Sequence, residues 1–142
     1  MGDDLHFLTF EPEIVFGAEK KFLRLADIEC YVISFGLSNR VWEVVAQWIG
    51  LAQRTVGEQY IRAIDSVSAN IAEGFGRYGK KDKIRFYRMA RASLFECLNW
   101  NEKAKTRNLL NLEQYKSLFS DLQRLPKSIN GLIKFTNEKL QT

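Results

Sequence analysis

The chain has 142 residues, a net charge of +4, 46% apolar residues and 27% charged residues. This length fits a single domain that buries about two-thirds of its unfolded surface, and the composition excludes a disordered or collagen-like chain. His6 is the single histidine, and the two cysteines, Cys30 and Cys97, lie far apart. These counts exclude the usual Cys/His zinc patterns and argue against a Ser-His-Asp site, so we expect no metal and no cofactor.

The sequence contains no candidate membrane segment and no leader pattern. No apolar run reaches the roughly 18 residues that span a bilayer. The acidic first residues lack the basic stretch and apolar core of a signal peptide. We therefore expect a cytoplasmic protein without a membrane partner, in which Cys30 and Cys97 are free, buried thiols.

Residues 1–24 differ from the rest of the chain in charge. Residues 1–19 carry five acids and no Lys or Arg, and Pro12 interrupts any helical period. We predict a loosely attached acidic N-terminal arm over residues 1–24, with a short strand or turn around Phe7–Phe16. Residues 25–142 form the second predicted unit.

Apolar residues three and four apart predict helices throughout that second unit. The first helix starts at about Asp27 and ends before Gly50, which suits the position just past a helix C-terminus. A short, polar-leaning connection over residues 50–57 follows. Thr55 and Glu58 have capping-box spacing and are expected to start the second helix.

The second helix is expected to end near residues 74–79, and the third to follow Lys80–Asp82. Asn111 and Gln114 resemble another cap pair, which starts the fourth helix, and Pro126 should kink or break that helix. Four amphipathic helices with short connections predict an all-α fold, an antiparallel up-and-down four-helix bundle.

The second predicted helix carries a polar stripe beside its apolar one. The stripe consists of small and hydrogen-bonding residues: Ala63, Ser66, Asn70, Glu73 and Arg77. A surface helix needs only one apolar stripe, with variable polar residues opposite it. The pattern therefore indicates a helix that is contacted on two sides. It concerns the packing of helices and subunits before it concerns catalysis.

Two chemical interpretations of this region compete with structural ones. Residues 74–79, GFGRYG, match GxGxxG, but a dinucleotide site needs a preceding strand, so we interpret them as an interhelical turn. Glu73 and Glu96 would suit a catalytic carboxylate pair. The favoured alternative is a buried polar network across a helix interface. Its members would be Asn70, Ser93, Glu96 and Arg77.

The strongest electrostatic feature lies between residues 77 and 91. Seven Lys and Arg oppose one Asp there, a local net charge of +6. Lys81, Arg85 and Arg88 share one helix face. Phosphate contacts, with aromatic residues stacking on bases, are the functional interpretation. The predicted nucleic-acid contacts are Arg77, Lys80, Lys81, Lys83, Arg85, Arg88, Arg91, Tyr78 and Tyr87. The alternative is a solvated basic face without a binding role. If several subunits brought this face together, their positive fields would add, and this alternative would explain the charge less well.

Two motifs carry a resemblance to a known family. The chain reads RA and NIAEG-x-GR within residues 62–77, and A-x-x-SL-x-E at residues 90–96. It resembles, over about residues 25–140, the four-helix-bundle family first found in 23S ribosomal RNA intervening sequences. Ser68 and Ala92 depart from the pattern, where many members have proline and glycine. The residues assigned to the structural motif are Arg62, Ser66, Asn70, Glu73, Gly74, Gly76, Ser93 and Glu96.

The resemblance implies a class of function. Related proteins form ring-shaped homopentamers with a basic surface. One branch comprises accessory variability proteins of diversity-generating retroelements, which bind nucleic acid and a reverse transcriptase. By resemblance we expect a homo-oligomer, with a pentamer implied, and RNA or DNA and a reverse transcriptase as partners. The family implies no enzymatic activity.

The combined prediction is a non-enzymatic, oligomeric accessory protein that binds structured RNA or RNA/DNA through the basic face of the third helix. The motif residues would hold helices or subunits in register. The alternative is a structural scaffold or adaptor that binds a protein partner without nucleic acid. A hydrolase using Glu73 and Glu96 is the third and least favoured hypothesis.

Overall fold

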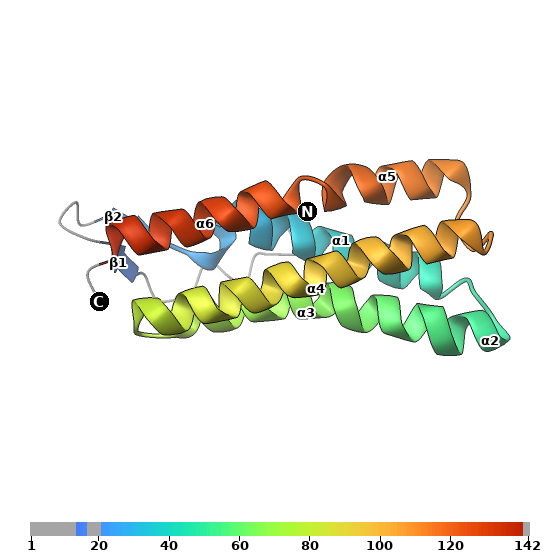
Figure 1. Cartoon of the computed structure of the whole chain (residues 1–142), viewed down its shortest axis with the longest axis horizontal. Helices are drawn as coiled ribbons and strands as arrows, with labels where there is room; N and C mark the ends of the chain where they lie inside the picture. Colours follow the sequence, from blue (N-terminus) through green and yellow to red (C-terminus); the bar gives the residue numbers. More distant parts are fainter. Residues whose placement is uncertain (1–13, 17–20, 141–142) are drawn as a thin grey trace.

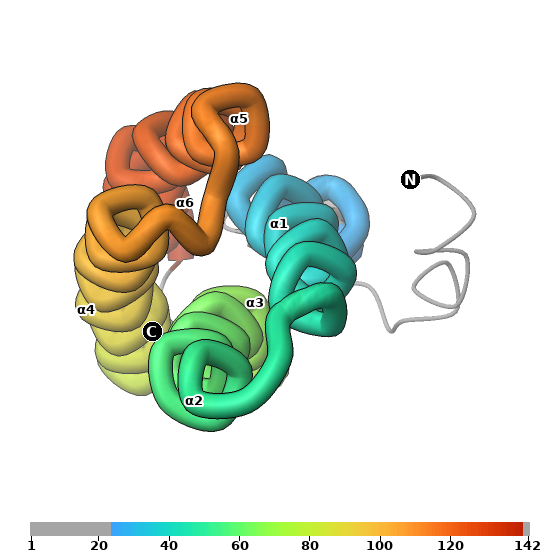
Figure 2. The backbone as a smooth tube through the Cα atoms, turned by 90° about the vertical axis from the view of Figure 1, so that its right-hand side faces the viewer, coloured from blue at the N-terminus to red at the C-terminus, as the bar shows by residue number. Residues whose placement is uncertain are grey.

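The computed structural model describes residues 14–16 and 21–140. Four helical columns enclose a single core, as the end-on view shows (Figure 2). The columns are α1 (Glu29–Val45), α3 (Glu58–Gly76), α4 (Lys80–Thr106) and a fourth built from α5 (Leu112–Leu122) and α6 (Leu125–Lys139). Consecutive columns run in opposite directions, and α5 and α6 follow one another along one edge (Figure 1). The predicted four-helix bundle is confirmed.

A small antiparallel pair of strands, β1 (Ile14–Phe16) and β2 (Lys21–Leu23), precedes the bundle. Strand β1 coincides with the end of the segment predicted to hold a strand or turn. Residues 7–13 of that segment, and most of the predicted acidic arm, lie outside the described residues. A 3₁₀ turn at Leu25–Asp27 then leads into α1.

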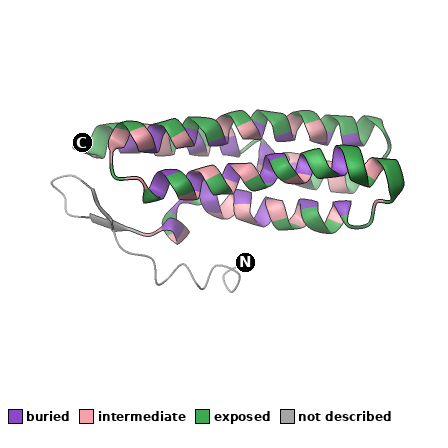
Figure 3. Ribbon diagram, turned by 90° about the horizontal axis from the view of Figure 1, so that it is seen from below, coloured by how far each residue is buried: buried purple, intermediate pink, exposed green. Residues whose placement is uncertain are grey.

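The core is formed by the inward faces of all four columns (Figure 3). Its largest fully buried apolar side chains include Leu37, Tyr60, Ile64, Ile71, Leu94, Leu122, Leu125 and Ile129. Each such residue contributes about 1.5–3 kcal/mol by leaving water. The Tyr60 hydroxyl donates to Oδ1 of buried Asn101 at 2.9 Å, which satisfies both oxygens, while Nδ2 of Asn101 is buried without a hydrogen-bond partner among the described residues.

The connection between the first two columns differs from the prediction. Helix α1 ends at Val45, and Gly50 does not terminate it but begins the short helix α2 (Gly50–Ala52) with a φ of +61°. A π-helical segment, Gln53–Gly57, continues directly into α3. Thr55 therefore lies inside a helical run, where its hydroxyl donates to the Leu51 carbonyl at 2.7 Å. The predicted polar connection and its capping box are wrong.

The predicted start and interruption of the fourth column are confirmed. The Asn111 side chain accepts from the Gln114 backbone N–H at 2.7 Å, and the Gln114 side chain accepts from the Asn111 backbone N–H at 3.0 Å. Together they satisfy two donors that a helix start leaves free. Pro126 lies in the first turn of α6, just after the break at residues 123–124.

Both cysteines are buried and free, as predicted. Burial raises the pKa of the Cys30 thiol to about 12, so it stays protonated at neutral pH. Among the described residues, no helix combines the length and hydrophobicity needed to cross a membrane.

Candidate nucleic-acid interface

The polar stripe of α3 packs against α4. The hydroxyls of Ser66 and Ser93 are hydrogen-bonded at 2.9 Å, and Asn70 Nδ2 donates to the Ser66 carbonyl at 2.8 Å and to its hydroxyl at 3.0 Å. Helix α1 covers the other side of α3 (Figure 2). The two-sided contact predicted for this helix is therefore made inside one chain, and the stripe no longer argues for assembly.

Gly74 lies at a close approach of α3 and α4. A Cβ atom there would lie 2.7 Å from Tyr87 Cε1 and 3.0 Å from the Lys83 carbonyl oxygen. Gly76 lies at the end of α3, where a Cβ would meet open space. Only the first of these two motif glycines is required by packing.

The remaining motif residues are exposed and do not join one network. Arg62 is ion-paired with Glu58 at 3.0 Å on the surface of α3. Glu73 accepts from Arg77 at 2.7 Å. Glu96 is exposed and makes no hydrogen bond or ion pair with the rest of the described chain. Of the four predicted network members, only Asn70 and Ser93 are connected, and Ser66, which was not among them, links the two.

Glu73 and Glu96 are also too far apart for the catalytic pair considered above. The helices are antiparallel and meet at Ser66 and Ser93, so the two carboxylates lie on opposite sides of that contact. The rise of 1.5 Å per residue separates them by about 15 Å along the bundle. Paired catalytic carboxylates in glycoside hydrolases are about 5–9.5 Å apart.

Two predicted nucleic-acid contacts are buried. Lys83 is 2% exposed, and its ammonium donates to the carbonyls of Phe75 at 2.6 Å and Gly74 at 3.4 Å, in the last turn of α3. Tyr87 is also 2% exposed and packs over Gly74. Burial lowers the pKa of Lys83 and raises the pKa of Tyr87. Neither side chain can reach a ligand, so both assignments are wrong.

Lys83→Met tests this correction. Met keeps the apolar stem but leaves the Phe75 carbonyl without its donor, while the Gly74 carbonyl still accepts from the Arg77 backbone N–H at 3.2 Å. We expect the loss of the charge-assisted bonds to exceed the relief of a buried ammonium. We expect about 1 kcal/mol lower unfolding free energy in urea, with the nucleic-acid affinity and its salt dependence unchanged. A clear loss of affinity in the folded variant would restore Lys83 to the interface.

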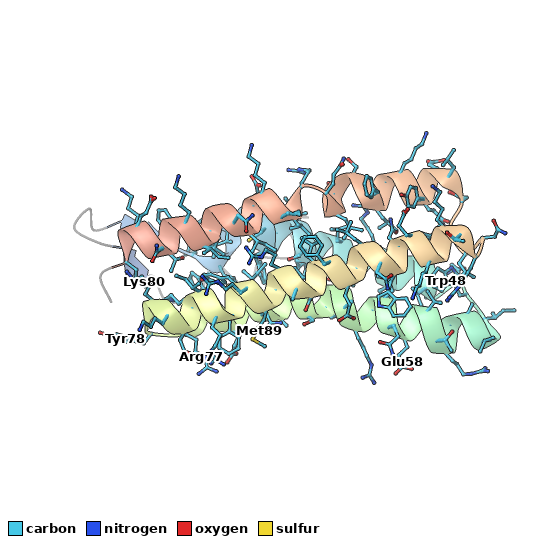
Figure 4. The ribbon with its side chains drawn as sticks, viewed as in Figure 1. Trp48, Glu58, Arg77, Tyr78, Lys80 and Met89 are labelled. Carbon is cyan, nitrogen blue, oxygen red and sulfur yellow. The ribbon has the colours of Figure 1, made fainter. Side chains whose placement is uncertain are left out.

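Arg85 is exposed and Arg77 is half-buried, and acids partly neutralise both. Their guanidinium groups lie over Phe86, with centroid distances of 4.7 and 4.8 Å. Asp82 is 3.0 Å from Arg85 and 3.8 Å from Arg77. Figure 4 shows Arg77 near Tyr78, toward one end of the α3–α4 pair. The net attraction of Arg77 and Arg85 for phosphate is reduced by the two acids, Glu73 and Asp82.

The other cations of α4 have no acidic partner among the described residues. Lys81 and Arg88 are exposed and form no hydrogen bond or ion pair with any described residue. Lys80 donates to the Asn137 carbonyl at 3.3 Å and Arg91 to Asn130 Oδ1 at 2.6 Å, and both partners are neutral. These two bonds tie α4 to α6.

Tyr78 is the one predicted aromatic contact that remains accessible within the described chain. It is 89% exposed and projects from the turn between α3 and α4 (Figure 4). The accessible part of the predicted interface consists of Arg77, Tyr78, Lys80, Lys81, Arg85, Arg88 and Arg91.

Sequence reasoning missed the contribution of α6 and an apolar groove. Asn130 and Asn137 are seven residues apart on the face of α6 that contacts α4, a spacing visible in the sequence.

Far from these contacts, a groove of about 480 Å³ lies between α1 and α3 and is lined by Trp42, Val45 and Ile61 among others. Trp42 is 61% exposed there.

A family model described as 23S rRNA-intervening sequence protein matches residues 26–131. The chain belongs to this family. The match begins just after the predicted arm, residues 1–24. A search of the curated proteins finds no match.

A solved structure of similar fold comes from Bacteroides thetaiotaomicron and is described as a protein of unknown function from the S23 ribosomal protein family. The two chains are 22% identical and superpose with a TM-score of 0.67, over 74% of this chain and 98% of the other. At this identity the likeness supports the fold.

Within the described residues, no group of three or more His, Cys, Asp or Glu side chains could hold a metal ion.

Proposed function

We propose that this member of the 23S rRNA-intervening sequence family is a non-enzymatic accessory protein that binds structured RNA or RNA/DNA in the cytoplasm. The observation that carries the proposal is the set of exposed cations on α4 that no described acid neutralises, Lys81 and Arg88 above all. Such cations displace the counterions condensed on a nucleic-acid backbone. The family description itself names an intervening sequence of 23S rRNA.

Assembly is part of the proposal. The family resemblance implies a homo-oligomer, with five subunits as its expected number, and a reverse transcriptase as a further partner. Repeating the α4 face in each subunit would sum the positive field over a larger surface and attract a polyanion more strongly than one chain does. The Ser66–Ser93 contact supports a role for the motif in helix register rather than in subunit contacts.

The salt dependence of binding tests the proposal. We expect the affinity for a structured RNA to fall about 10³-fold between 50 and 200 mM salt if about six phosphates are contacted. Fluorescence anisotropy with labelled RNA would measure this change, and light scattering would report the assembly present. Failure to retain structured RNA or DNA even at about 50 mM salt would overturn the proposal.

The groove beside Trp42 favours a second candidate function, a scaffold that binds a protein partner. Ile49 and Leu51, 85% and 70% exposed, lie at the same end of the molecule. Exposed apolar clusters of this kind mark protein interaction sites more often than nucleic-acid sites. Such binding would depend weakly on salt, so the same titration distinguishes the two candidates.

A further inference from the structure

The outward face of α6 carries a second pair of cations that matches the pair on α4. Lys127 and Lys134 are exposed, seven residues apart, and free of hydrogen bonds and ion pairs to any residue described. Lys81 and Arg88 have the same spacing on α4. Seven residues are two helical turns, so each pair projects from one line of its helix with about 10.5 Å between its members.

The contacts between the two helices set the pairs beside each other. Arg91 bonds to Asn130 and Lys80 to the Asn137 carbonyl, so residues 80–91 of α4 run alongside residues 130–137 of α6. Lys134 lies within that stretch, and Lys127 lies one turn beyond it. Figure 1 shows the two helices side by side along this edge of the bundle.

Few acids interrupt this surface. Asp82 directly follows Lys81, but it is ion-paired with Arg85 at 3.0 Å. Glu138 is exposed one turn after Lys134 and limits the surface at that end. Glu29 and Lys127 line a shallow depression on the far side of α6, toward α1. The cations between these limits point outward from two neighbouring ridges.

We propose that α4 and α6 together bind the sugar-phosphate backbone of a double helix, with Lys81 and Arg88 on one strand and Lys127 and Lys134 on the other. This inference rests on the proposed function and names its ligand class. Packed helices lie 8–10 Å apart, and outward side chains on two ridges are farther apart than that. Such a separation suits phosphates on two strands flanking a groove of a duplex, whose major groove in B-DNA is about 12 Å wide.

The aromatic residues agree with a duplex rather than a single strand. Single-strand binding uses aromatic platforms along the backbone groove. Tyr87 is buried, and Tyr78 lies at the tip of the α3–α4 pair. Phe95 is 58% exposed on α4, which leaves one aromatic beside the four cations. Backbone contact without base stacking gives binding that is independent of sequence.

The test compares Lys127→Glu/Lys134→Glu with Lys103→Glu/Lys116→Glu. Both variants change the net charge equally, and the control lysines are exposed near the other end of the bundle. Probes are an RNA duplex and a DNA duplex of about 20 base pairs and an unstructured single strand of the same length, measured by anisotropy. The wild type should prefer the duplexes by about tenfold or more. The α6 variant should lose about 60-fold in duplex affinity at 0.1 M salt, with a salt slope smaller by about 1.8.

The control variant should change duplex affinity less than about threefold, because its lysines lie far from the two cation pairs. Equal losses in both variants, or a single strand bound as tightly as the duplexes, would overturn the inference. If Lys81→Glu/Arg88→Glu abolishes binding while the α6 variant binds normally, the inference fails and the proposed function stands. If the wild type binds none of the probes, both fail.

Discussion

Reversing the charges of Lys81 and Arg88 is expected to weaken nucleic-acid binding by about 10²-fold at 0.1 M salt without unfolding the protein. Each phosphate contact that is lost lowers the slope of log affinity against log salt concentration by about 0.9. For two phosphates at 0.1 M salt, this loss amounts to about 60-fold in affinity. The two new carboxylates also repel the phosphate backbone, which weakens binding further. Both side chains are exposed and form no bond with the described protein. Anisotropy measures the affinity, and circular dichroism checks the fold.

Lys103→Glu/Arg107→Glu is the matched control for this prediction. It makes the same chemical changes near the other end of α4, where both side chains are exposed. Arg88 and Lys103 are fifteen residues apart, or about 22 Å along the helix, which is more than two Debye lengths at 0.1 M salt. If the control variant lost as much affinity as Lys81→Glu/Arg88→Glu, binding would reflect net charge alone, and α4 would not be the interface.

The errors in the predicted interface have a physical cause that the sequence partly contains. Lys83 is four residues before Tyr87 and seven before Ala90, on the stripe that continues to Leu94. All four are buried. The helical period therefore placed Lys83 on the inner face, but its charge suggested an outer one. Only the structure shows what compensates the burial, since the carbonyl acceptors of Gly74 and Phe75 lie on another helix.

The polar stripe of α3 shows a different limit of sequence reasoning. Its composition indicated contact on two sides, and α1 and α4 supply that contact. A stripe does not encode whether its neighbour belongs to the same chain or to another. The register of Ser66 against Ser93 depends on the turn at residues 77–79 and on the length of both helices. Assembly therefore has to be argued from other surfaces.

Residues 50–57 were predicted as a short, polar-leaning connection that begins with Gly50 just past a helix C-terminus, and glycine is a poor helix former in general. Gly57 is buried, and a Cβ there would lie 2.6 Å from Val45 Cγ1. Its presence in a helical run thus reflects close packing against the end of α1, which overrides intrinsic propensity. In contrast, Asn111 and Gln114 cap their helix as predicted, because capping depends on residues three apart in the chain.

Gly74→Ala is expected to destabilise the protein by about 1–2 kcal/mol, although alanine is the better helix former. The gain in helix propensity is about 1 kcal/mol. Overpacking a tight contact costs about 1–3 kcal/mol, and the upper part of that range applies here. The new methyl would meet the Tyr87 ring at 2.7 Å and the Lys83 carbonyl oxygen at 3.0 Å, and neither can move aside without shifting α4. Urea unfolding followed by circular dichroism would measure the difference.

Gly76→Ala gives the matched comparison on the same helix. A methyl group there meets nothing within 4 Å, and the residue does not need a positive φ, so the substitution should stabilise the protein by up to about 1 kcal/mol through helix propensity alone. Opposite signs at two glycines two residues apart would identify Gly74 as the point that sets the α3–α4 distance. If Gly74→Ala were as stabilising as Gly76→Ala, that close approach would not constrain the fold. The glycine of the family motif would then need an explanation other than packing.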